Sequence, residues 1–461
     1  MRRRDLSALL LLALVACNFQ QFDKFSEDTP STAFVDRSYG ARVALTSDAS
    51  GITVLAAGGN PGEGVRFFTV GDGRSAPSTV PRSTAALCEL STDKIVGGTP
   101  CVGGTTLAAA GTLNDGGSDA TPGLDHIGCF AVGYGRVTTA ATLYGPVIAC
   151  ADGQVFTLGG ATGSQVEKSL SLLDPAALTA LRIAFAALPG AGKLPSKNPP
   201  LLMGSEADGG AWFWPAATPG SAPRVVPAPS DGKTARFGAS VAMARGAGTS
   251  LLLVAAPEAG RIYAYTPGAT ATDAPVPVAC LEGDKGAGSA IGVGDLDGDG
   301  LDDVAVTDPR RVRIFLGKKR PTTLGTGDCP STWPAEPVEL TCAETAGAGG
   351  CSAAQFGASL AIGDLDGNGQ VDLAVGAPNA SYAGVDGAGA VFLFSPLSST
   401  TVLDVRGLAS PNAGDAFGAS IAIGKVGTQD TLAVGARGKG GAYVTWCTKL
   451  PGDPGGARCR K

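Results

Sequence analysis

The sequence predicts an all-β protein built from repeated units, and three observations lead to that fold class. Glycine occupies 69 of the 461 positions and proline 31, a composition that suits many short strands and tight turns better than long helices. Hydrophobic residues make up 44% and charged residues only 16%, which is enough apolar surface for a sizeable core and too much for a long disordered chain. Finally, four segments in the second half of the chain align with one another.

The four aligned segments share one pattern. They start at Phe237, Ala287, Phe356 and Phe417. Each holds two or three short apolar runs that alternate with period two between Gly, Pro and Asp, as strands do. One such small sheet cannot bury both of its faces, whereas sheets stacked around an axis can. The repeat therefore predicts a β-propeller.

The same segments resemble a known repeat. The Phe-Gly opening, the Gly-Ala-Pro run at 376–378 and the Asp-rich loop between them are similar to FG-GAP repeats, the blades of the integrin α-subunit N-terminal propeller. The second unit departs from the pattern with Ala287 for Phe and Thr307-Asp-Pro for Gly-Ala-Pro, and the fourth ends in Arg437. The resemblance covers about 237–447 and implies seven blades, with eight as the alternative.

The chain divides into an N-terminal export region, a propeller over 39–447 and a C-terminal tail over 448–461. We expect three weakly patterned blades, one of them enlarged, and four strongly patterned ones. Their expected ranges are 39–75, 84–160 and 170–216, then 237–268, 287–317, 356–396 and 417–447. A helix over 174–188 is also expected, with Asp174 as N-cap and Pro175 at the first helical position.

The N-terminus is typical of an export signal. Three arginines at 2–4 precede an apolar stretch at 8–15 that is too short to span a bilayer. It ends in Ala16-Cys17, which resembles the lipobox of bacterial lipoproteins. The resemblance implies a signal peptide over 1–16, a lipidated Cys17 and a flexible tether over 17–38. The protein is thus expected to be exported and held at the cell envelope by lipid alone, and Asn18 favours the outer membrane.

The cysteines agree with export. Of eleven cysteines, ten remain after Cys17, and an even number in an oxidising compartment predicts up to five disulfides. Neighbouring cysteines are the expected partners, although spacing does not fix connectivity. The expected pairs are Cys88–Cys101, Cys129–Cys150, Cys280–Cys329, Cys342–Cys351 and Cys447–Cys459. Zinc is not expected, because the chain has one histidine and no Cys-x-x-Cys.

Two Asp-Gly loops carry the strongest site signal. Oxygen-bearing side chains stand at positions 1, 3, 5 and 9 of each, and the position-7 carbonyl can add a further oxygen. Alternate side chains on a tight glycine-containing loop can converge on calcium, which takes six to eight oxygens. We therefore expect two structural Ca²⁺ sites. Their residues are Asp295, Asp297, Asp299, Leu301 and Asp303 in the first loop, and Asp364, Asp366, Asn368, Gln370 and Asp372 in the second.

Two other interpretations of these loops were weighed. An EF-hand requires Glu at position 12, where the loops have Val306 and Val375, and its flanks are helical. An acidic hairpin turn without metal is the second alternative, which two matching copies disfavour. The corresponding loops of the first and fourth units begin with Arg245 and Lys425, so no calcium is expected there.

Composition and motifs also bound the function. A net charge of −6 argues against a nucleic-acid partner. The single histidine, His126, and the scattered acids form no catalytic constellation, so no enzyme is predicted; these acids are Glu206, Asp208, Glu258 and Glu282. The alternating Trp212 and Trp214 fit strand core better than a sugar-stacking site. We expect a calcium-stabilised module that binds a protein or glycan at the envelope, with an envelope-polymer hydrolase or lyase, or a structural subunit, as alternatives.

Overall fold

The structure is a computed structural model, and the prediction of an all-β chain is confirmed. The described part contains only two short 3-10 helices, η2 (Pro257–Ala259) and η3 (Gly317–Lys319). The described residues are 33–35, 39–47, 53–59, 65–70, 81–85, 101–114, 125–137, 142–151, 155–158, 168–170, 183–187, 198–206, 209–218, 221–230, 234–246, 248, 250–270, 273–321, 327–334, 338–342, 348–349, 354–365, 369–395, 404–408, 410–426, 429–448 and 458–459.

Three antiparallel sheets come from the first half of the chain. Sheet 1 contains β2 (Tyr39–Ser47), β3 (Thr53–Gly59), β4 (Val65–Val70) and β5 (Pro81–Ala85). Sheet 2 contains β6 (Cys101–Asn114), β7 (Asp125–Val137), β8 (Thr142–Cys150), β9 (Val155–Thr157) and β10 (Lys168–Leu170). Sheet 3 contains β11 (Ile183–Ala187), β12 (Leu201–Ser205), β13 (Gly210–Trp214) and β14 (Arg224–Val226).

The second half supplies four more large sheets and one small one. Sheet 4 contains β15 (Val241–Arg245), β16 (Ser250–Ala256), β17 (Arg261–Thr266), β18 (Val276–Glu282) and β22 (Thr332–Trp333). Sheet 5 contains β19 (Ile291–Gly294), β20 (Asp303–Asp308), β21 (Arg311–Phe315) and β23 (Glu339–Thr341). Sheet 6 contains β25 (Ser359–Gly363), β26 (Asp372–Ala377), β28 (Ala390–Phe394) and β29 (Asp404–Arg406). Sheet 7 contains β30 (Phe417–Val426), β31 (Gln429–Ala436), β32 (Gly441–Thr448), β33 (Arg458–Cys459) and β1 (Ala33–Val35). A separate pair is formed by β24 (Ala348–Gly349) and β27 (Ser381–Tyr382).

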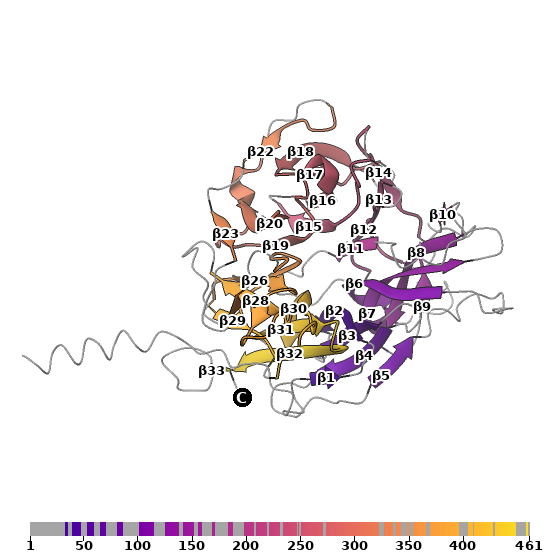
Figure 1. Ribbon diagram of the computed structural model, residues 1–461. Coiled ribbons are helices and arrows are strands. Elements are labelled where there is room, and N and C mark those ends of the chain that lie inside the picture. The colour runs from indigo at the N-terminus through magenta and orange to yellow at the C-terminus, as the bar shows by residue number, and fades with distance from the viewer. Residues whose placement is uncertain are drawn as a thin grey trace, which may run out of the picture.

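The seven large sheets of the described chain stand in a ring (Figure 1). The first strand of each sheet contacts the first strand of the next, in the cycle β2, β6, β11, β15, β19, β25, β30 and back to β2. This closed cycle of four- and five-stranded sheets is the arrangement of a β-propeller. The sequence predicted seven blades, with eight as the alternative.

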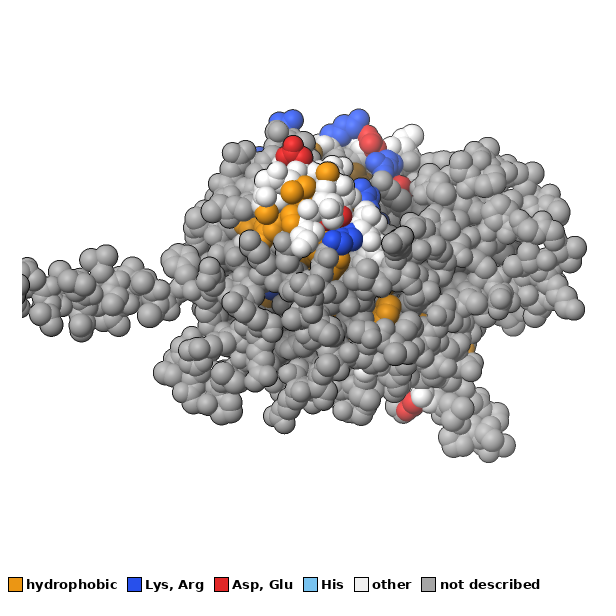
Figure 2. All heavy atoms as spheres, turned by 60° about the horizontal axis from the view of Figure 1, so that its bottom comes forward, with side chains coloured by type: hydrophobic (Ala, Val, Ile, Leu, Met, Phe, Trp, Pro, Cys, Tyr) orange, Lys and Arg blue, Asp and Glu red, His pale blue; other side chains and the backbone are white. Residues whose placement is uncertain are grey.

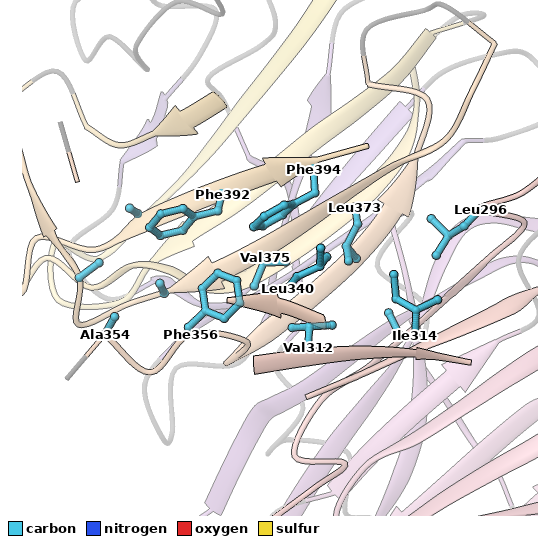
Figure 3. Close-up of a cluster of buried hydrophobic side chains, with 14 of the residues drawn as sticks. Leu296, Val312, Ile314, Leu340, Ala354, Phe356, Leu373, Val375, Phe392 and Phe394 are labelled. Atoms are coloured by element: carbon cyan, nitrogen blue, oxygen red, sulfur yellow. The ribbon is translucent and has the colours of Figure 1, made fainter. Parts of the chain in front are cut away.

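Buried side chains fill the spaces between successive sheets. The described apolar side chains form seven buried clusters, and each joins two neighbouring sheets. Figure 3 shows the cluster between sheets 5 and 6, where Phe356, Phe392 and Phe394 lie on one side and Val312 and Ile314 on the other. Each sheet is thus covered on both faces, which explains the nearly continuous burial of second strands such as β20 and β26.

The Phe-Gly opening of three strong units has a structural role. The Phe ring packs edge-on against aromatic side chains of the third strand of its own sheet: Phe237 lies 5.8 Å from Tyr263, Phe356 lies 5.5 Å from Phe392, and Phe417 lies 5.9 Å from Tyr443. The following glycine has a positive φ in all four units, between 84° and 93°, which side chains with a Cβ rarely adopt.

The expected unit ranges end too early, for one reason. In every sheet the outermost strand lies beyond the range expected for that unit, as with β5, β14, β23 and β29. These strands are short and follow long connections, so they carry little of the repeat pattern. The outermost strand of sheet 7 is β1, which pairs antiparallel with β32. The tether expected over 17–38 is therefore wrong for 33–35, because this short apolar run completes the last sheet.

Two further expectations are corrected. The helix expected over 174–188 is wrong for Ile183–Ala187, which forms β11 paired with β12, because tertiary pairing overrides a favourable helical composition. The tail over 448–461 contains β33, which pairs with β32. The signal peptide over 1–16 and Cys17 lie outside the described residues.

Candidate metal centre

The two Asp-Gly loops occupy the same place in neighbouring sheets. The first joins β19 to β20 in sheet 5, and the second joins β25 to β26 in sheet 6. In the first loop Gly298 and Gly300 have φ of 75° and 87°, and a Cβ at either would meet no atom within 4 Å. Glycine is thus needed there for backbone conformation rather than for space.

Three carboxylates of the first loop converge. One oxygen each from Asp295, Asp297 and Asp303 lies within 4.8 Å of the others, the only such group of three acids, histidines or cysteines in the described part of the chain. Two oxygens on opposite sides of a calcium ion, each at about 2.4 Å, are about 4.8 Å apart. The spacing therefore fits ligands of one ion. Asp299 is outside this group and accepts a hydrogen bond from the Leu301 amide at 2.8 Å.

Backbone amides hold these carboxylates in place. Asp295 accepts hydrogen bonds from the amides of Asp299 at 3.0 Å and Gly300 at 2.9 Å. Asp303 accepts from Leu296 at 2.8 Å and from Gly317 at 2.7 Å. The loop is thus preorganised around the acids, and Asp303 also ties it to the end of β21.

The grouped acids of the first loop repel one another electrostatically. Burial, with the neighbouring Asp297 and Asp299, raises the pKa of Asp303 to about 6, although two amide hydrogen bonds act in the opposite direction. Lys318 forms an ion pair with Asp297. The hydrogen bond from Lys318 to Asp297 raises the pKa of Lys318, and the negative charges of Asp297, Asp299 and Asp303 raise it further. A bound cation would relieve the same repulsion.

The second loop repeats two hydrogen bonds of the first. The Leu365 amide donates to Asp372 at 3.1 Å, as Leu296 does to Asp303, and the Gly369 amide donates to Asp364 at 3.0 Å, as Gly300 does to Asp295. Oδ1 of Asp364 is buried and has no hydrogen-bond partner among the described residues, as expected of an oxygen that can coordinate a cation. Asp366 and Asn368 lie outside the described residues, and Gln370 is exposed at the end of the turn.

The residues fit a hard cation. The converging ligand atoms of the first loop are all carboxylate oxygens. Calcium and magnesium prefer such oxygen ligands, whereas zinc and copper favour nitrogen or sulfur. In the second loop the buried, unpartnered oxygen of Asp364 points to the same chemistry.

The corresponding loops of sheets 4 and 7 hold ion pairs instead. Arg245 binds the fully buried carboxylate of Asp302 in the next sheet, with Nη2 at 2.7 Å and its own amide at 2.7 Å. In sheet 7, Lys425 lies 2.7 Å from Asp430, which also accepts the amide of Asp364 from sheet 6 at 2.9 Å. Sequence reasoning missed Asp302 and Asp430. Both lie at the start of a second strand, Asp302 directly before β20 and Asp430 as the second residue of β31, and this position was the available signal.

The disulfides partly follow the expected pairing. Cys129–Cys150 and Cys280–Cys329 are confirmed. Cys342 is disulfide-bonded, while its expected partner Cys351 lies outside the described residues, as does Cys88. Cys447 and Cys459 face each other in the register of β32 and β33, and Cys101 begins β6.

The remaining candidates have structural roles where they are described. Glu206 pairs with Arg236, Glu258 with Lys285 at 2.9 Å, and Glu282 with Arg261 at 3.4 Å. Such mixing of charges is visible on the face in Figure 2, where acidic and basic side chains lie side by side. Trp212 and Trp214 are buried between sheets 2 and 3. Asp208 and the side chain of His126 lie outside the part of the chain that the structure describes.

Comparison with known proteins agrees with this architecture. The FG-GAP repeat family model matches 287–315 and 356–394, the segments that hold the two acidic loops. No curated protein matches the chain. Within the described residues, no helix has the length and apolar character needed to cross a membrane. The chain is thus a β-propeller that contains FG-GAP repeats.

Solved structures similar to this chain include two proteins. One is the six-bladed fungal lectin of Aleuria aurantia, with 9% identity and a TM-score of 0.36 over 93% of this chain and 96% of that one. The other is a complex of KlAtg21 with the coiled coil of AgAtg16, with 11% identity and a TM-score of 0.33 over 79% of this chain and 98% of that one.

Proposed function

We propose that this protein is a calcium-stabilised β-propeller that binds a protein or glycan at the bacterial cell envelope, to which the lipid on Cys17 anchors it. The observation that carries the calcium part is the convergence of Asp295, Asp297 and Asp303 within 4.8 Å. Calcium would offset part of the negative charge of the first loop and, by its place between two strands, stiffen sheet 5. We propose the same for the second loop in sheet 6.

A binding role, rather than catalysis, is supported by the state of the polar side chains. The described acids outside the two loops that sequence reasoning singled out are engaged in ion pairs. The seven unit-to-unit cores give a rigid ring. Such a ring presents its loops as a fixed surface.

Thermal unfolding of the full chain with calcium and with a chelator tests the metal. Calcium at about 100 times its dissociation constant should stabilise the fold by about 2.7 kcal/mol per site. The Asp297→Ala/Asp366→Ala double variant should lose this gain, whereas Glu258→Ala/Glu282→Ala, which removes two acids elsewhere on the surface, should keep it. Equal unfolding midpoints with calcium and with chelator would show that the two loops are turns that bind no calcium.

Anchoring is tested separately. The wild-type chain should incorporate a radiolabelled fatty acid and fractionate with membranes, and Cys17→Ala should do neither. Membrane association of the unlabelled variant would contradict a lipid anchor at that residue.

A further inference from the structure

The two acidic loops differ in one neighbour. They share oxygen-bearing side chains at positions 1, 3, 5 and 9 and two backbone hydrogen bonds. Only the first has a lysine fixed against it in the described structure, because Nζ of Lys318 contacts Oδ2 of Asp297. Asp297 is one of the three converging acids, so the ammonium contacts a carboxylate that a metal ion would need.

The backbone that carries Lys318 is firmly held. Gly317, directly before it, donates its amide to Asp303 at 2.7 Å. The carbonyl of Leu316 accepts the indole N–H of Trp333 at 2.9 Å, and Trp333 is itself buried between sheets 4 and 5. The lysine side chain beyond this fixed point is 49% exposed, against 11% for Asp297. Its ammonium can therefore leave the carboxylate for water without moving the backbone.

The second loop has a different residue at this place. Phe315 pairs with Val304 in sheet 5, and Phe394 pairs with Leu373 in sheet 6. Phe315 and Phe394 are therefore equivalent positions. Lys318 and Leu397 each lie three residues after one of them, so Leu397 corresponds to Lys318 in the sequence. The second loop is thus without this internal cation in its sequence, and it has Asn368 where the first has Asp299.

We infer that Lys318 determines the calcium affinity of the first loop, acting as a tethered cation that competes with the ion for Asp297. This inference rests on the proposed calcium binding. Without metal the ammonium balances part of the charge of the acids. When calcium enters, the ammonium must give up Oδ2 of Asp297 and remain near a doubly charged ion, which costs free energy at short range. The first loop should consequently bind calcium more weakly than the second.

Calorimetric titration of the full chain with calcium tests this. In an Asp366→Ala background, which isolates the first loop, Lys318→Gln should raise calcium affinity about tenfold, a modest change because the lysine is half exposed and partly screened. Lys319→Gln removes the same charge one residue further along and should leave affinity within about twofold. In an Asp297→Ala background, Leu397→Lys should lower the affinity of the second loop.

The outcomes separate the inference from the proposed function. Calcium binding to the first loop that is unchanged or weakened by Lys318→Gln would overturn the inference and leave the calcium site intact. Binding to the first loop that appears only in Lys318→Gln would support it. No binding to either loop, with or without Lys318, would overturn both. The Leu397→Lys variant gives an independent result should Lys318→Gln fold poorly.

Discussion

The hydroxyl of Thr307 donates a hydrogen bond to the carbonyl oxygen of Gly357 at 2.6 Å, and this bond joins sheet 5 to sheet 6. Neighbouring sheets are joined at the same place by serines: Ser359 donates to Gly418 at 2.8 Å, and Ser240 donates to Gly288. Sheet 5 has Ala290 where sheets 4, 6 and 7 have serine. The hydroxyl therefore comes from the adjacent strand instead, and the bond between sheets is kept.

This exchange explains a departure from the repeat. Sheet 6 has Gly376 where sheet 5 has Thr307, and a Cβ at Gly376 would lie 2.3 Å from Oγ of Ser359 and 2.2 Å from the carbonyl oxygen of Gly418. In sheet 6, serine on the first strand thus leaves no room for a Cβ on the second, whereas sheet 4 has Ala255 at this place beside Ser240. Threonine on the second strand, in turn, requires a small residue without a hydroxyl on the first.

Removing the Thr307 hydroxyl should destabilise the protein. Thr307→Val keeps the shape but leaves the Gly357 carbonyl without this donor, and we expect a loss of about 1–2 kcal/mol in urea unfolding. Ala290→Ser alone should also destabilise, because its hydroxyl would crowd Thr307. The Ala290→Ser/Thr307→Gly double variant restores the arrangement of sheets 6 and 7 and should recover most of the loss.

A matched control is available in Thr332, which is exposed on β22. Thr332→Val should change stability by less than about 0.5 kcal/mol. Additive losses in the Ala290→Ser/Thr307→Gly variant would show that the two positions do not exchange one hydroxyl.

Breaking the pair between Arg245 and Asp302 should be costly. The Asp302 carboxylate is fully buried and accepts both the side chain and the amide of Arg245. Arg245→Met leaves this charge without its cation, so we expect a loss of up to about 3 kcal/mol, reduced by the 37% exposure of the arginine side chain. Arg261→Met, at an exposed pair 3.4 Å from Glu282, should cost less than about 1 kcal/mol. Comparable losses in the two variants would contradict a special role for the buried carboxylate.

The sequence indicated the fold class, four repeated units and the acidic loops because each of these has a local pattern. Period-two alternation marks first, second and third strands, and Asp-Gly spacing marks the loops. The outermost strands were not predictable: β1 lies in sequence far from β32, and β14 has only three residues. Their pairing follows from closure of the ring and from long connections, which leave no local pattern.

The candidate site was predictable in its ligands and not in its surroundings. Asp295, Asp297 and Asp303 converge as the spacing suggests. Asp302 is adjacent to a loop ligand in the sequence, yet its carboxylate serves the neighbouring sheet through Arg245. Lys318 reaches the first loop from the end of β21, fifteen positions beyond Asp303 in the numbering. Such contacts between strands or between sheets join residues at no regular sequence spacing, so the sequence pattern does not predict them.

Metal-free protein should become more stable as the pH falls from 7 towards 5. Burial, with Asp297 and Asp299, raises the pKa of Asp303 to about 6, above its value of about 3.9 in an unfolded chain. Between these values the folded state binds a proton that the unfolded state does not, so stability falls as the pH rises through this window. The difference amounts to at most about 3 kcal/mol.

The measurement is urea unfolding in chelator at several pH values, on the wild type and on Asp303→Asn. The difference in stability between the two should change mainly between pH 4 and pH 6, and other acids cancel in that comparison. In calcium the ionised carboxylate is needed as a ligand, so calcium should stabilise the wild type less below pH 6. A constant difference between the two proteins across this range would contradict the raised pKa.

The disulfide between Cys280 and Cys329 should stabilise the protein more than the one between Cys129 and Cys150. The first closes a loop of 49 residues and the second a loop of 21, and loop-closure entropy gives up to about 4 and about 3 kcal/mol respectively. The first also holds a crossing segment: beyond Cys329, β22 adds a parallel strand to sheet 4, where the Cys280 amide donates to Ser331 at 2.8 Å. Trp333 on β22 in turn holds Leu316 beside the first acidic loop.

Urea unfolding of the Cys280→Ser/Cys329→Ser and Cys129→Ser/Cys150→Ser variants checks the order of the two losses. Hydrogen exchange adds a local readout. The first variant should speed exchange at the Cys280 amide and at Gly317, whose amide binds Asp303, because β22 is then held only by its few strand hydrogen bonds and by Trp333. The second variant should leave exchange at both unchanged. Equal protection at Gly317 in the two variants would show that Trp333 alone fixes the segment beside the loop.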